Sequence, residues 1–106
     1  MKKKKSILKE LKLELDEHLP GLVRKIIFYG SYVRGDSHKD SDLDVLLIVN
    51  KNIDWKTKDI IYEICNEINI KYDVWIDVNW INEEDLNGIR SKLPFIQKAF
   101  TEGVTV

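Results

Sequence analysis

Cysteine, proline and histidine are scarce in this sequence of 106 residues, which holds one, two and two of them respectively. A single cysteine, Cys65, excludes a disulfide within the chain and fits a reducing compartment. It falls on an apolar stripe of helical spacing between residues 60 and 68, which favours core packing over nucleophilic chemistry. One cysteine and two isolated histidines do not supply the four ligands of a zinc site.

Long hydrophobic runs and an excess of charge are also missing. No window approaches the roughly 18 apolar residues of a membrane span, and no apolar segment of a signal peptide follows the lysines at positions 2–5. Acidic and basic residues nearly cancel, with a net charge of −1, whereas nucleic-acid binders need a basic patch or stripe. We therefore expect a cytoplasmic protein without membrane contact or direct nucleic-acid binding.

The length and the hydrophobic pattern indicate a single domain over residues 1–106. Helical spacing, alternation and capping residues predict elements in the order helix, strand, strand, helix, strand, helix, with a further short helix before the last one. Their expected ranges are a helix ended by Leu19-Pro20-Gly21, strands over 24–29 and 42–49, a helix capped by Asp54, a strand over 72–81, a short helix opened by a capping box at Asn82 and Asp85, and a last helix from Pro94 to Gly103. This order predicts an α+β fold with a mixed β-sheet of three or more strands flanked by helices.

The most informative feature is Gly30-Ser31, followed ten residues later by Asp42-Leu43-Asp44, with an apolar strand on each side. A glycine lets the backbone approach a bulky anion closely, and backbone N–H groups together with the Ser31 hydroxyl can bind phosphate. Alternate residues of a strand share one face, so Asp42 and Asp44 point the same way. Carboxylates in this arrangement suit Mg²⁺, which binds through one or two carboxylates and substrate phosphates.

Structural interpretations of the same residues also exist. Gly30-Ser31 is found in ordinary turns, and the two aspartates are compatible with strand-edge carboxylates. Aspartate is depleted in strands, however, and two on one inward-looking face cost repulsion and desolvation unless they bind something. An EF-hand fails because Val45 replaces the turn glycine, and a P-loop fails because Asp36 replaces the lysine.

These motifs resemble the nucleotidyltransferase superfamily that includes DNA polymerase β and kanamycin nucleotidyltransferase. The shortness of the chain is similar to the minimal branch of that superfamily, the MNT-type antitoxins that accompany HEPN-domain partners. The resemblance spans most of the chain, from the strand before Gly30 to the helix that begins at Pro94. The motif itself is confined to residues 30–44 and one later aspartate.

The resemblance implies a set of site residues. Asp42 and Asp44 would coordinate two Mg²⁺ ions, and a third carboxylate would come from the next strand. Asp77 fits best because it lies mid-strand and off the core-facing row, and Asp73, which shares its parity, is the second choice. Gly30 and Ser31 would bind the β- and γ-phosphates of ATP.

Three further residues lie near this site by spacing. Arg34 matches an arginine common in the branch and would bind the triphosphate, pair with an aspartate of its own loop, or stay solvated. Tyr32 and Trp75 are compatible with stacking on a nucleotide base, although general packing is the favoured role for both.

The resemblance also implies a function, namely Mg²⁺-dependent transfer of AMP from ATP to a hydroxyl, with a tyrosine of a HEPN-domain toxin as acceptor. One alternative is a small-molecule nucleotidyltransferase of the aminoglycoside type. The other is a catalytically silent antitoxin that acts by binding alone. The sequence leaves open the acceptor, the base preference and the oligomeric state.

Overall fold

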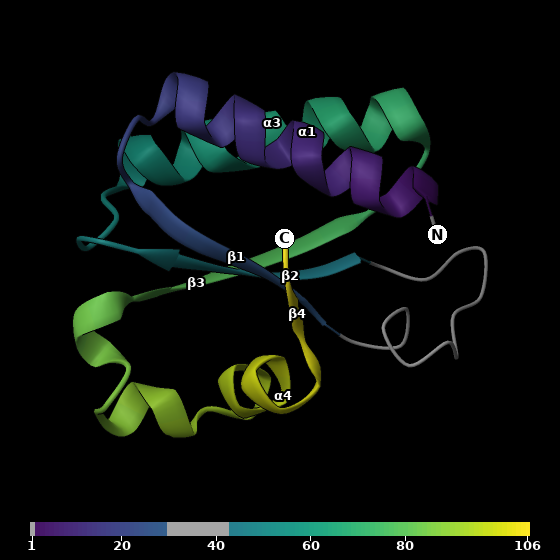
Figure 1. The fold of residues 1–106 in the computed structure, drawn as a ribbon. Helices are drawn as coiled ribbons and strands as arrows, with labels where there is room; N and C mark the ends of the chain where they lie inside the picture. Colours follow the sequence, from purple (N-terminus) through teal and green to yellow (C-terminus); the bar gives the residue numbers. More distant parts are fainter. Residues whose placement is uncertain (1, 30–42) are drawn as a thin grey trace.

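A computed structural model describes residues 2–29 and 43–106, and it places a four-stranded sheet between two helical layers (Figure 1). Gly30, Ser31, Arg34 and Asp42, to which the sequence assigned roles, lie outside the described residues, as does Tyr32. The elements are, in chain order, α1 (Lys2–His18), β1 (Val23–Tyr29), β2 (Leu43–Val49), α3 (Trp55–Tyr72), β3 (Ile76–Asn82), the 3₁₀ helices η1 (Glu83–Asp85) and η2 (Ile89–Lys92), α4 (Pro94–Glu102) and β4 (Val104–Thr105).

The strand order is β3-β2-β1-β4, and the sheet is mixed. β1 runs antiparallel to both β2 and β4, whereas β2 and β3 run parallel. A parallel pair needs a crossover connection, and α3 supplies it. The predicted α+β class and mixed sheet are therefore confirmed, and β4 is a strand that the sequence did not predict.

Two apolar cores lie on opposite faces of the sheet. α1 and α3 cover one face (Figure 1), where the core includes four residues of β2 at alternating positions, Leu43, Val45, Leu47 and Val49. α4 covers the other face, where Leu46 and Ile48 pack with Ile96 and Ala99. The predicted alternation of β2 is confirmed, and both faces are covered, as a strand in the middle of a sheet requires. Cys65 is buried in the first core.

Local capping explains where several elements begin and end. The Asp54 side chain accepts a hydrogen bond from the Thr57 backbone N–H at 2.8 Å, which confirms the predicted helix cap. Pro94 occupies the first turn of α4, as predicted. Asn82 caps η1 by accepting from Glu84 N–H, but that element is a 3₁₀ turn. In the described part of the chain, no helix combines the length and apolar character that a membrane crossing requires.

The beginning of β3 corrects the expected strand over 72–81. Tyr72 is the last residue of α3, and Asp73 follows it in the left-handed conformation with φ 53°. Asn69, near the helix end and buried, bonds twice to the segment that follows: its carbonyl accepts from Val74 N–H at 3.1 Å and its side-chain oxygen accepts from Ile76 N–H at 2.8 Å. Because these bonds hold the backbone after Tyr72 against the end of α3, the strand begins only at Ile76.

Candidate active site

The parallel pairing of β2 and β3 brings two of the predicted carboxylates together. Asp44 and Asp77 are direct partners in the register of the two strands, and both belong to the sheet face that α4 covers farther along. Neighbouring strands lie about 4.8 Å apart, so the two carboxylates stand side by side. Asp77 is exposed and Asp44 is half-buried.

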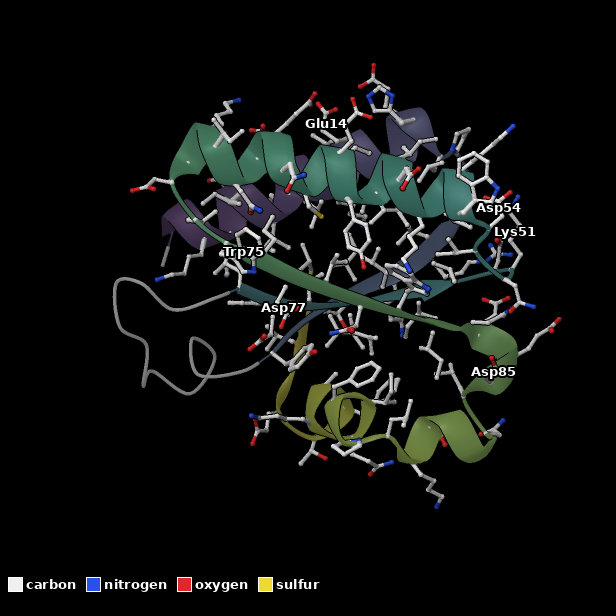
Figure 2. All side chains as sticks on the ribbon, turned by 180° about the vertical axis from the view of Figure 1, so that it is seen from behind. Glu14, Lys51, Asp54, Trp75, Asp77 and Asp85 are labelled. Atoms are coloured by element: carbon white, nitrogen blue, oxygen red, sulfur yellow. The ribbon has the colours of Figure 1, made fainter. Side chains whose placement is uncertain are left out.

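The pair lies at the end of the sheet where β1 finishes and β2 begins. Tyr29, the last residue of β1, is the register partner of Asp44 on the side opposite Asp77. In the sequence, Gly30 and Ser31 directly follow Tyr29, and the described residues resume at Leu43, the first residue of β2. Asp77 lies toward this end of the molecule in Figure 2. The connectivity therefore joins the predicted phosphate-binding motif to the strand ends that carry the carboxylates.

Tyr29 belongs to the site although sequence reasoning gave it no role. It is buried, with only 4% of its surface exposed. Burial raises the pKa of Tyr29 above its ordinary value of 10.0, a side-chain hydrogen bond with Asn79 acts in the opposite direction, and the negative charges of Asp44 and Asp77 raise the pKa further. The hydroxyl is therefore protonated at neutral pH and lies within the electrostatic field of both carboxylates.

Asn79 is the second residue that was overlooked. It follows Asp77 by two positions in β3, so its side chain lies on the same face, and its hydrogen bond with Tyr29 links the two strands that flank β2. The signals were present in the sequence, because Tyr29 directly precedes Gly30 and Asn79 shares the parity of Asp77. Neither signal indicates a contact until the strand order is known.

Asp73, the second choice for the third carboxylate, has a different position. It follows α3 as its left-handed C-cap and precedes β3, so it takes no part in the pairing with β2. Trp75 also differs from expectation, since 58% of its surface is exposed. The prediction that Trp75 serves mainly in packing is therefore wrong.

The donor set fits a hard divalent cation. Two carboxylates on adjacent strands present oxygen ligands to one side, which is the arrangement that Mg²⁺ accepts together with substrate phosphates. The third predicted ligand, Asp42, lies two residues before Asp44 and outside the described residues. Another group of potential ligands among the described residues, Glu14, Glu17 and His18, belongs to the outer part of α1 and lies apart from this pair.

Comparison with known proteins identifies the family. The sequence model of the nucleotidyltransferase domain matches residues 8–103. A protein of Methanocaldococcus jannaschii that is provisionally named a protein adenylyltransferase is 37% identical over 70 residues, which cover 66% of this chain and 71% of that protein.

Solved structures share the fold. A toxin-antitoxin structure with AMP-PNP superposes with a TM-score of 0.61 at 22% identity, over 92% of this chain and 69% of the other. A complex of a tri-AMPylated HEPN toxin with its MNT antitoxin, from Shewanella oneidensis, gives a TM-score of 0.56 at 19% identity, over 95% and 69% of the two chains. With the family match over most of its length and carboxylates paired on adjacent strands, this chain belongs to the nucleotidyltransferase domain family and is an enzyme of that class.

Proposed function

We propose that this chain transfers AMP from ATP to a tyrosine hydroxyl of a partner protein, and that the partner is a HEPN-domain toxin which the modification neutralises. The observation that carries the proposal is the register pairing of Asp44 with Asp77 beside the end of β1. The name of the M. jannaschii relative supports a protein acceptor. The AMPylated toxin in a complex of the same fold supports the kind of partner.

The residues of the site have distinct roles in this reaction. Asp42, Asp44 and Asp77 would hold two Mg²⁺ ions, and Gly30, Ser31 and Arg34 would bind the triphosphate. When bound, Mg²⁺ neutralises charge on the phosphoryl oxygens and stabilises pyrophosphate as it leaves. Carboxylates on two hydrogen-bonded strands are held rigidly, so the chain contributes mainly by positioning.

The transfer is a substitution at the α-phosphorus. The acceptor oxygen forms a bond to that phosphorus, the bond to the oxygen that bridges to the β-phosphate breaks, and pyrophosphate departs with the electron pair. The hydroxyl proton passes to the Asp77 carboxylate, which is exposed and therefore open to an acceptor, and from there to solvent. The hydrogen bond between Tyr29 and Asn79 links β1 and β3 across β2, the strand that carries Asp44.

Co-expression with a HEPN-domain partner and intact-mass spectrometry of that partner test the proposal. The wild-type chain should add about 329 Da for each AMP to the partner and remove its toxicity, whereas the Asp42→Ala chain should leave both mass and toxicity unchanged. An unmodified partner that both chains neutralise equally would instead support an antitoxin that acts by binding alone. Labelling of aminoglycosides but not of the partner would support the small-molecule alternative.

A further inference from the structure

β3 has an open outer edge. It is the last strand of the sheet, and no other strand of the described ranges pairs with its outer side. The Trp75 carbonyl accepts from Leu43 N–H at 2.8 Å, so alternation directs the backbone of Asp77 toward β2 and the backbones of Val78 and Trp80 outward. Asn69 already satisfies the outward N–H of Ile76. The edge is therefore closed at its beginning and presents backbone donors and acceptors from Val78 onward.

A groove borders this edge and reaches the active site. It is a cavity of about 290 Å³ between α3 and β3, and its lining includes Tyr62, Asn66, Trp75, Asp77 and Asn79. Figure 2 shows Trp75 and Asp77 next to each other along β3, with Trp75 toward α3 and Asp77 toward the opposite face. The groove therefore runs along the part of β3 that carries Asp77, the residue that we assign as the proton acceptor.

The chemistry of the lining favours an uncharged, extended peptide. Asp77 is the one charged side chain among the described residues that line the groove, and the exposed Asn66 offers an amide donor and acceptor. Trp75 and Tyr62 are exposed by 58% and 42%, and exposed aromatic residues of this kind are typical anchors of protein interfaces. A polycationic aminoglycoside would find one carboxylate here. The volume also lies at the lower limit of small-molecule pockets, roughly 300 Å³.

We propose that the open edge of β3 is the acceptor-docking site, where an extended, uncharged segment of the acceptor protein adds as a fifth strand. Its backbone pairs with Val78 and Trp80, and its side chains on one face contact Trp75 and Tyr62. Because an added strand lies about 4.8 Å from β3, a hydroxyl side chain on its other face stands beside Asp77. This inference rests on the proposed transfer to a protein hydroxyl.

Peptide titration of the ¹⁵N-labelled chain without nucleotide tests the docking directly. The probe is an acetylated and amidated seven-residue peptide of threonine and valine with one central tyrosine, used at millimolar concentration. It should shift the amide resonances of Val78 and Trp80, and the same peptide with alternate backbone nitrogens methylated should not, because methylation removes the donors that an added strand needs. Absence of these shifts, or equal shifts with both peptides, would overturn the proposal.

Matched substitutions test the groove. Trp75→Ala should weaken peptide binding about tenfold and leave Mg²⁺-ATP affinity unchanged, whereas Trp55→Ala, which truncates a tryptophan of similar exposure at the start of α3, should change neither. Val78→Pro should abolish peptide binding that Val78→Ala retains, because proline removes an N–H that faces outward, and Val78→Ala controls for the loss of the buried valine side chain. If Trp75→Ala weakens ATP binding and leaves peptide binding intact, Trp75 stacks on the nucleotide and the proposal is wrong.

The two proposals fail in distinguishable ways. A wild-type chain that binds the peptide at β3 but transfers no AMP to any acceptor would contradict the proposed function without contradicting the docking proposal. A chain that transfers AMP normally to its partner with Trp75→Ala and with Val78→Pro would contradict the docking edge alone.

Discussion

Replacing Asp77 by asparagine tests the pairing of carboxylates across β2 and β3. The substitution removes a negative charge and keeps the size of the side chain. Two charges about 4.8 Å apart repel by about 1 kcal/mol at the dielectric constant of water, and exposure and salt reduce that figure. Because Asp77 is exposed, we expect the apo chain to keep its melting temperature or gain a few degrees, since about 1 kcal/mol corresponds to roughly 4–8 °C at this size.

Activity should respond very differently. Asp77→Asn removes a proposed metal ligand that is also the proposed proton acceptor, so the rate of the proposed AMP transfer should fall by about 10²–10⁴-fold or more. Asp73→Asn is the matched control, since Asp73 is also exposed and asparagine tolerates its left-handed conformation equally well. Thermal melts and labelled-ATP transfer assays of both variants check the reasoning. A severe loss of stability in Asp77→Asn, or loss of transfer in Asp73→Asn alone, would refute it.

Three further predictions concern ligand binding, the thiol and the packing. ATP should bind much more weakly in EDTA than with Mg²⁺, because its phosphates would face uncompensated carboxylates; equal affinities in calorimetry would contradict the two-metal site. Burial raises the pKa of Cys65 from 9.0 to about 12, so the native protein should resist alkylation at pH 8 until urea is added. The stability that this buried thiol contributes should be complete below pH 9 and be lost as the pH rises toward 12. Gly103→Ala should destabilise the fold by about 1–3 kcal/mol in urea melts, because an added Cβ there would collide with Ile27 and the Ala99 carbonyl. Gly88→Ala should be tolerated, because the nearest atom to an added Cβ there, the Asp85 carbonyl oxygen, is 3.6 Å away.

Local patterns in the sequence were sufficient for most elements and for the faces of the strands. Alternation over β2 predicts which side chains enter each core, because successive residues of a strand point to opposite faces whatever the strand pairs with. Asp54 and Pro94 predict helix starts because capping depends on residues within one turn. The beginning of β3 was misplaced because bonds from Asn69 outweigh the alternation that starts at Tyr72.

The motif around Gly30-Ser31 and Asp42-Leu43-Asp44 indicated the chemistry, and the family match confirms the enzyme class. The family resemblance predicted that Asp77 joins Asp42 and Asp44, but the contacts themselves are decided by the tertiary structure. The partnership of Asp44 with Asp77, the bond between Tyr29 and Asn79, and the open edge of β3 all depend on strand order and register. Register arises from the packing of segments far apart in the chain, here through the α3 crossover, so it leaves no local pattern in the residues that it brings together.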